Sequence, residues 1–153
     1  MWSLIESGLH HLFKSHPAVH AALPVLSGQV AGGITTPGSA AQQLLDQGAQ
    51  AVLLKGGHLT GDVVSDLFMN RSGESFWMRA PRIASPNTHG TGCTLSSAIA
   101  AHLALGDSLQ DAVRAGHSFV KTALAAGTSV CTGSGSGPLN HGAAPRRMQL
   151  IPI

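Results

Sequence analysis

The stretch SPNTHGTGCTLSSAIAA, residues 85–101, joins a glycine-containing loop to a run of residues typical of a helix. Gly90 and Gly92 lack the Cβ atoms that would keep an anion away from the backbone. The first amide groups of a helix have no acceptor within the helix and lie at the positive end of its dipole, so such a helix start binds phosphate well. We therefore predict an anion hole formed by the backbone of Gly90, Thr91, Gly92 and Cys93. Glycines that serve only packing or a turn are the alternative.

Upstream of this stretch, the sequence predicts a helix, a strand and a β-hairpin. Pro37 suits a first helical position and Gly48 a helix end, which predicts a helix of about ten residues between them. The apolar run AVLL, residues 51–54, is typical of a strand that is buried on both faces of a parallel sheet. Residues 62–69 and 75–83 carry β-compatible side chains on either side of a glycine-containing turn, which indicates a hairpin.

Downstream of the stretch, the sequence predicts two helices. Leu95, Ile99 and Leu103 recur at every fourth position, so one face of the first helix is expected to pack against a neighbour. Gly106 is expected to end this helix, and the Asp-Ser pair that follows is expected to cap the next one. Two antiparallel helices that back one face of a sheet are the natural arrangement, and the fold class is α/β.

Lys55, Gly56, Gly57 and His58 follow the apolar run, at the strand end where open α/β sheets bind their ligands. A lysine at this place can pair with a phosphate as a compact charge. A solvated lysine before a glycine turn is the alternative. His58 is expected to shape the loop rather than to catalyse a reaction.

The composition favours one globular domain. The chain has 153 residues, of which 43% are hydrophobic and 10% charged, enough for a modest apolar core. The net charge is +2, and the basic residues are scattered apart from Arg146 and Arg147, which argues against a nucleic-acid-binding surface. No apolar run approaches membrane-spanning length, and Glu6 stands where a secretory signal would carry a basic residue. We therefore expect a cytoplasmic protein.

Neither the cysteines nor the histidines indicate a metal site. Cys93 and Cys131 lie too far apart in sequence for a local metal knuckle, and reduced thiols are expected. Several histidines lie between residues 10 and 20, but Pro17 interrupts any helix that would align them. A solvated segment is therefore the preferred interpretation, and no metal-binding residue is assigned.

Three stretches of the sequence resemble one enzyme family. NTHGTGCTLSSAIAA, residues 87–101, closely resembles the signature of the hydroxymethylpyrimidine/phosphomethylpyrimidine kinases of thiamine biosynthesis, a branch of the ribokinase-like superfamily. AVLLKGGHLTGD, residues 51–62, resembles a second stretch of that family at a compatible spacing. TGSGSGPLNH, residues 132–141, resembles a glycine-rich segment near its C-terminus. The resemblance implies a truncated ribokinase-like fold, with a mostly parallel sheet flanked by helices and a β-hairpin.

The resemblance covers only the C-terminal portion of the family's kinase domain. It spans residues 34–141, with residues 1–33 as an unrecognised N-terminal segment and residues 142–153 as a tail. Members of the family have a much longer chain before the KGGH segment, which holds the first strands, most of the pyrimidine pocket and an acidic motif that helps to hold Mg²⁺. No acidic residue of this chain lies in such a motif. We therefore expect weak ATP binding and poor turnover, unless a complementing chain or a homo-oligomer restores the rest.

The resemblance also implies substrates, cofactors and site residues. The substrates are 4-amino-5-hydroxymethyl-2-methylpyrimidine and its monophosphate, and the cofactors are ATP and Mg²⁺. Lys55 and Gly57 lie where these kinases bind the nucleotide, and His117 lies where some relatives have a lysine near the nucleotide. Cys93 stands where most ribokinase-like enzymes have a catalytic Asp and the pyrimidine kinases have Cys, which implies that it is the catalytic base. A buried, inert cysteine is the alternative.

Two other functions are compatible with the same residues. The pyridoxine and pyridoxal kinases form a sister family with a similar GTG loop, and Cys93 in place of Asp favours the pyrimidine kinases over them. A non-catalytic, nucleotide-binding remnant is the third interpretation, because so much of the kinase domain is missing from the resemblance.

Overall fold

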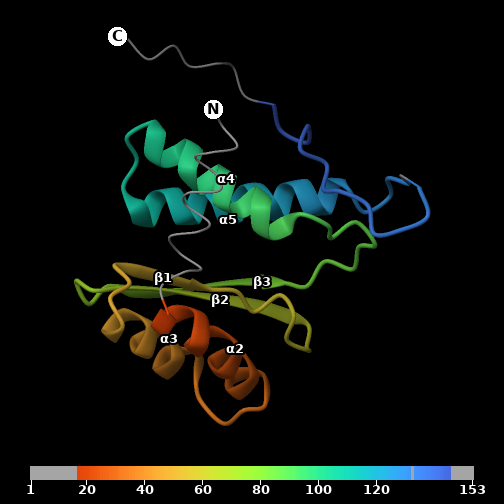
Figure 1. Cartoon of the computed structure of the whole chain (residues 1–153). Helices are drawn as coiled ribbons and strands as arrows, with labels where there is room; N and C mark the ends of the chain where they lie inside the picture. The colour runs from red at the N-terminus through yellow and green to blue at the C-terminus, as the bar shows by residue number, and fades with distance from the viewer. Residues whose placement is uncertain (1–16, 132, 146–153) are drawn as a thin grey trace. The chain divides into compact units, whose positions relative to one another are not determined.

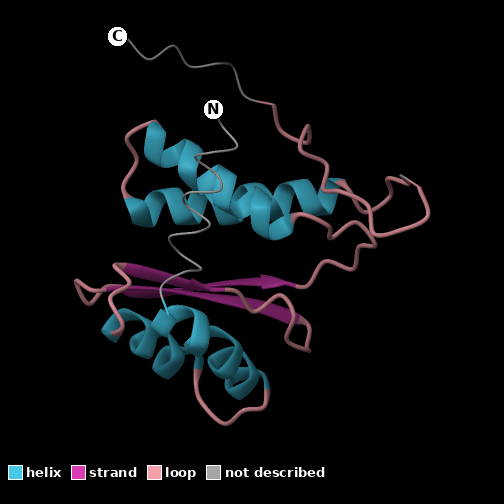
Figure 2. Ribbon diagram, in the orientation of Figure 1, coloured by secondary structure: helices cyan, strands magenta, loops and turns pink. Residues whose placement is uncertain are grey.

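The computed structural model describes the backbone of residues 17–131 and 133–145 (Figure 1). The burial of the side chains is described from residue 21 onward. The chain divides into two compact units, Met1–Pro81 and Arg82–Ile153. In the first unit two helices accompany a sheet, and the second unit is built on two further helices with the loops around them (Figure 2).

The first unit contains α2 (Pro17–Ala31), α3 (Pro37–Asp46), β1 (Ala51–Leu54), β2 (Val63–Asn70) and β3 (Ser75–Pro81). These bounds confirm the predicted ten-residue helix and place the three predicted strands within two residues of their expected ends. The start of α3 follows from its sequence, because the hydroxyl of the N-cap Thr36 accepts a hydrogen bond from Ser39 N at 3.1 Å.

The sheet is antiparallel throughout its described strands, so the prediction of a mostly parallel sheet is wrong for them. β2 lies between β1 and β3, and Phe68 is opposite Leu53 on one side and Phe76 on the other. Residues 55–62 and 71–74 are the connections, and both are shorter than the dozen or more residues that a parallel crossover needs. β1 lies at an edge of this sheet and is only partly buried, which also corrects the expected burial on both faces.

The core of the first unit lies between its helices and one face of β1. Leu26 of α2 packs with Ala40 and Leu44 of α3, and Val52 and Leu54 of β1 pack against this cluster. The sequence predicts no helix for residues 17–31, and Pro24 lies inside α2, where a proline normally breaks a helix. The apolar contacts of α2 with α3 explain why tertiary packing overrides that local preference.

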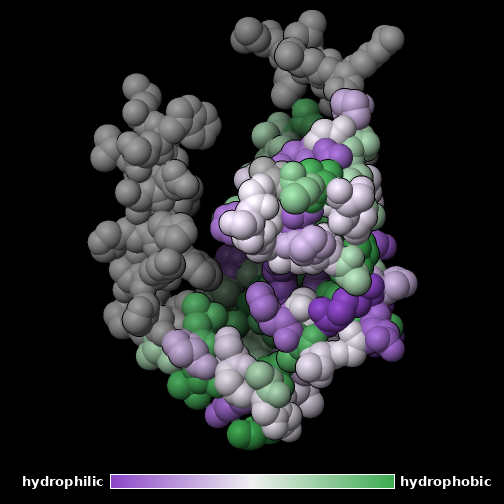
Figure 3. All heavy atoms as spheres, turned by 90° about the vertical axis from the view of Figure 1, so that its right-hand side faces the viewer, coloured by the Kyte–Doolittle hydropathy of each residue, from purple (hydrophilic) through white to green (hydrophobic). Residues whose placement is uncertain are grey.

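Residues 1–16 lie outside the described residues, and with them most of the histidines between residues 10 and 20. Within the described part of the chain, no group of three or more His, Cys, Asp and Glu side chains is placed to hold a metal ion. None of the described helices combines the length and the hydropathy that a membrane crossing needs. On the face drawn in Figure 3, hydrophobic and hydrophilic residues are interspersed.

The second unit is built on the helix pair α4 (Thr91–Ala104) and α5 (Leu109–Ala126), which lie side by side (Figure 1). Both predicted helices are confirmed, and Ser108 caps α5 by accepting a hydrogen bond from Asp111 N at 3.2 Å. The two helices approach closely at Gly116, where a Cβ atom would come within 2.9 Å of Ile99 Cγ1. The pair therefore depends on a residue without a side chain at this position.

We predict that Gly116→Ala lowers the free energy of unfolding by about 1–3 kcal/mol, because the added methyl group overpacks the contact between α4 and α5. Gly28→Ala is the matched control, since Gly28 lies in α2 with open space around it, and the change should stabilise the helix by up to about 1 kcal/mol. Urea unfolding of both variants measures the two effects. Equal effects of the same sign would contradict the close approach at Gly116.

Candidate functional site

The first turn of α4 has the backbone that the predicted anion hole requires. Gly90 precedes the helix with φ 83° and ψ 7°, in the left-handed region that favours glycine, and no side chain caps the helix. Thr94 N donates the first hydrogen bond of the helix, to Gly90 O at 2.8 Å. The amides of Thr91, Gly92 and Cys93 precede this bond, so they have no acceptor within the helix and can bind an anion.

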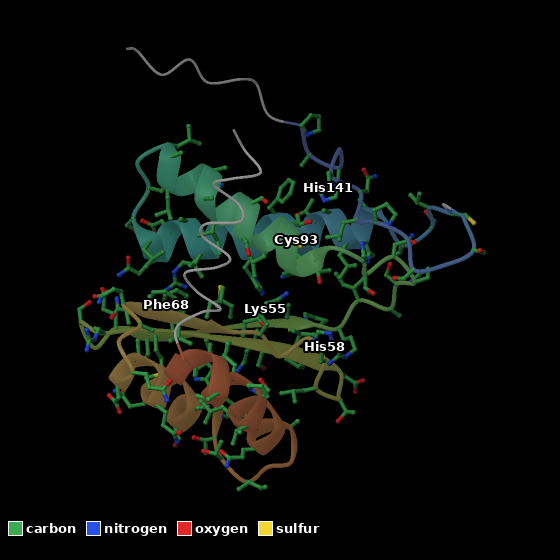
Figure 4. All side chains as sticks on the ribbon, viewed as in Figure 1. Lys55, His58, Phe68, Cys93 and His141 are labelled. Atoms are coloured by element: carbon green, nitrogen blue, oxygen red, sulfur yellow. The ribbon has the colours of Figure 1, made fainter. Side chains whose placement is uncertain are left out.

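Cys93 is the third residue of α4, and its thiol is free and exposed (Figure 4). The alternative of a buried cysteine is therefore wrong for this structure. A free thiol at the positive end of a helix is placed to react with, or take a proton from, a group bound at the same helix start.

The loop before α4 is fixed by the buried side chain of Asn87, which is only 3% exposed. Its amide nitrogen donates to Gly127 O and to Val130 O, both at 2.6 Å. Its amide oxygen fills the space beside Gly137, where a Cβ atom would overlap it. One side chain thus joins the entry to α4 with the end of α5 and with the C-terminal segment. Asn87 lies within the motif that carries the family resemblance, but the residue types around it do not predict these contacts.

The C-terminal glycine-rich segment runs beside the same loop. His89 N donates to Gly137 O at 3.2 Å, and His89 forms a parallel bridge with Pro138. The Ser136 hydroxyl donates to Pro86 O at 2.9 Å. These contacts show that the described part of this segment is bonded to the loop that carries the motif.

A further contact ties the PLNH end of that segment to the first turns of α4. Thr94 Oγ1 and His141 Nε2 are 2.9 Å apart, and Thr94 is 9% exposed. Thr94 directly follows the residues whose amides are available for an anion. The match to PLNH was the only sequence signal for this contact, because spacing alone cannot bring residues 94 and 141 together.

An open cavity of about 1230 Å³ lies between α4, α5 and the C-terminal segment. Gly90 and Cys93 line it, so an anion at the helix start would be accessible from this space. His102 also lines it, and its Nδ1 lies 2.6 Å from an Asp107 carboxylate oxygen. His117 is not among its lining residues, so the structure does not bring His117 to the cavity beside Cys93.

Lys55 and Gly57 belong to the first unit, in the loop between β1 and β2, and both are exposed. The loop is anchored at Gly56, whose N–H donates to the buried Asp66 carboxylate at 2.9 Å. A Cβ atom at Gly56 would overlap Ser65 O, so only glycine fits there. Figure 4 shows Lys55 and His58 in this loop. The sequence does not predict this role of Asp66, because a hydrogen bond to a backbone group ten residues away has no sequence signature.

The chain is similar to known proteins over most of its length. The family model described as phosphomethylpyrimidine kinase matches residues 19–140, so the match begins within the segment that the sequence analysis left unrecognised. A hydroxymethylpyrimidine/phosphomethylpyrimidine kinase of Streptomyces coelicolor is 50% identical over 103 residues, which cover 67% of this chain and 37% of that protein. The enzyme of the same name from Rhizobium meliloti is 39% identical over 141 residues, covering 91% of this chain and 52% of that protein.

Among solved structures, the pyridoxal kinase of Staphylococcus aureus in complex with AMP-PCP is similar, with a TM-score of 0.63 and 33% identity. The likeness covers 70% of this chain and 38% of that one. The ribokinase-like α/β fold is therefore confirmed. The chain spans between about a third and about half of the length of these relatives.

We predict that Gly90→Ala lowers the free energy of unfolding by roughly 1–2 kcal/mol, because an L-residue is strained at the left-handed φ of this position. Gly135→Ala is the matched control, since Gly135 has open space around it and no positive φ. Urea unfolding compares the two variants. A Gly90→Ala variant as stable as Gly135→Ala would show that the helix does not start from a left-handed glycine.

Proposed function

Because this chain belongs to the phosphomethylpyrimidine kinase family, we propose that it serves the ATP-dependent phosphorylation of 4-amino-5-hydroxymethyl-2-methylpyrimidine and of its monophosphate. The observation that supports the proposal best is the uncapped start of α4, whose amides at Thr91, Gly92 and Cys93 can receive a phosphate. The relatives from S. coelicolor and R. meliloti carry the corresponding name.

In the proposed reaction, backbone amides neutralise the charge that the transferred phosphoryl group carries. Phosphoryl transfer depends mainly on positioning and on electrostatic stabilisation of the equatorial oxygens. The amides of residues 91–93 supply fixed partial positive charges, and Gly90 and Gly92 let the anion approach the backbone. We assign Lys55, in the loop after β1, to the nucleotide phosphates as a compact positive charge. Gly57, in the same loop, is also assigned to the nucleotide. We also assign His117 to the nucleotide, although His117 does not line the cavity beside Cys93.

Cys93 is the proposed catalytic base. Its free, exposed thiol lies at the helix start that would hold the transferred group. In the first transfer, the thiolate takes the proton of the substrate hydroxyl while the hydroxyl oxygen attacks the terminal phosphorus of ATP, and ADP leaves. In the second transfer the acceptor is a phosphomonoester, which is largely ionised at neutral pH and has little need of a base.

ATP is the proposed phosphoryl donor. The AMP-PCP complex of the similar S. aureus kinase supports a nucleoside triphosphate site on this fold. We propose that Mg²⁺ accompanies ATP, bound through the phosphate oxygens as is usual for this ion. The described residues offer no cluster of carboxylates for it, and none of the proposed steps needs an ion held by them. ATP and a free thiol both suit the cytoplasm, which is the proposed location.

The chain corresponds to 37% of the S. coelicolor relative and 52% of the R. meliloti relative. We propose that this chain by itself binds ATP weakly and turns over slowly, and that a complementing chain or a second copy raises the rate. Fast turnover by the purified 153-residue chain would contradict this part of the proposal.

Pyridoxine or pyridoxal phosphorylation is the second candidate, favoured by the structural likeness to S. aureus pyridoxal kinase at 33% identity. The higher identity of 50% to the S. coelicolor enzyme favours the pyrimidine substrates. A nucleotide-binding remnant without activity is the third. Single-turnover assays with hydroxymethylpyrimidine, its monophosphate and pyridoxine separate the three. Transfer to pyridoxine alone would support the second candidate, and nucleotide binding without any transfer the third.

We predict that Cys93→Ser slows the first phosphoryl transfer by on the order of 100-fold or more, since a general base contributes about 10²–10⁴-fold. The second transfer should slow by less than about tenfold, because its acceptor has little proton to lose. Single-turnover assays with each acceptor, protein in excess, measure both rates. Cys131→Ser, which alters the other exposed free thiol, is the control and should change neither. Equal losses in the two transfers would exclude Cys93 as the base of the first.

A further inference from the structure

The start of α4 has no local support of its own. Gly90 has no side chain to cap the helix, and no other side chain does so. Gly90 and Gly92 also allow more backbone conformations than any other residue type. The amides of residues 91–93 nevertheless have to point at one place to bind a phosphate, so their direction must be fixed by contacts outside the turn.

Asn87 supplies such a contact, three residues before Gly90. Both N–H groups of its amide are used, one by Gly127 O and one by Val130 O, at 2.6 Å each. Gly127 is the C-cap of α5, where a helix leaves carbonyl groups without partners. Asn87 therefore bonds to the end of α5, where Gly127 O also accepts from Val130 N at 3.1 Å, and at the same time fixes the approach to α4.

The oxygen of the Asn87 amide fixes the orientation of the side chain. It packs against Gly137, where any larger residue would displace it. The same stretch holds the loop a second time, through the bond from His89 N to Gly137 O at 3.2 Å. Asn87 is 3% exposed and its bond to Gly127 O is buried, so losing that bond removes a partner from a buried polar group, which is costly.

We propose that Asn87 is the positioning residue of the phosphate-binding turn: it acts through the end of α5 to aim the amides of residues 91–93, and it touches neither the nucleotide nor the substrate. This role rests on the proposed function, because it presumes that the turn binds phosphate. It makes a specific claim, namely that removing Asn87 weakens the binding of phosphate groups more than it weakens the binding of the rest of the nucleotide.

The test compares the wild-type chain with Asn87→Ala. Backbone amide NMR follows the signals of residues 91–93 during titration with AMP-PCP and, separately, with AMP, which lacks the terminal phosphate groups. We expect the affinity for AMP-PCP to fall by about tenfold or more in the variant, and that for AMP to fall by much less. Thr128→Ala is the matched control, because it removes a hydrogen bond at the same end of α5 that does not reach the turn, and its affinities should equal the wild-type values.

A folded Asn87→Ala variant that binds AMP-PCP like the wild type would overturn the positioning role and leave the proposed function standing. Wild-type amides of residues 91–93 that do not respond to AMP-PCP would overturn the phosphate site itself, and the positioning role with it. Should Asn87→Ala fail to fold, Gly137→Ala tests the same claim. In that variant Asn87 is kept, and the new Cβ atom of residue 137 displaces its side-chain amide. Equal losses for AMP-PCP and AMP in either variant would indicate a general structural effect and would also overturn the proposal.

Discussion

The helix start at Gly90 depends on hydrogen bonds made far away in the sequence. A left-handed glycine opens α4 and leaves amides free, but it supplies no cap to hold the turn. The Asn87 amide reaches the end of α5, some forty residues further on, and the segment around Gly137 lies along the same loop. Because the bond to Gly127 O is buried, it holds the turn in one conformation more firmly than a solvated cap would.

The loop after β1 is organised in a similar way. Gly56 has no room for a side chain, and its N–H is bonded to the buried carboxylate of Asp66 on β2. Lys55 and Gly57 on either side of it remain exposed. In both loops a glycine allows a close approach, and a buried polar side chain from another part of the chain fixes the backbone. An exposed group held on such a rigid base can meet a ligand with little loss of conformational entropy.

Structural similarity identifies the fold of this chain, and sequence similarity identifies its family. The structural likeness to a pyridoxal kinase identifies the ribokinase-like fold, and one fold can serve enzymes with different substrates. The match to the phosphomethylpyrimidine kinase model over residues 19–140 and the 50% identity to one relative identify the family. The activity itself stays a proposal, since the chain corresponds to about a third to a half of the length of those relatives.

Local patterns in the sequence predict the helices α3, α4 and α5, the three strands and the family, because each depends on local signals: caps, apolar periods, glycines at turns and short motifs. The tertiary structure was needed to show that β1 pairs antiparallel with β2, beside the hairpin that the sequence predicts, and that α2 forms despite Pro24. It also showed which residues support the two glycine loops. Asn87 and Asp66 act through hydrogen-bond partners that lie ten or more residues from them along the chain. Hydrogen bonds between such partners form only when the chain has folded, so no local sequence pattern predicts them.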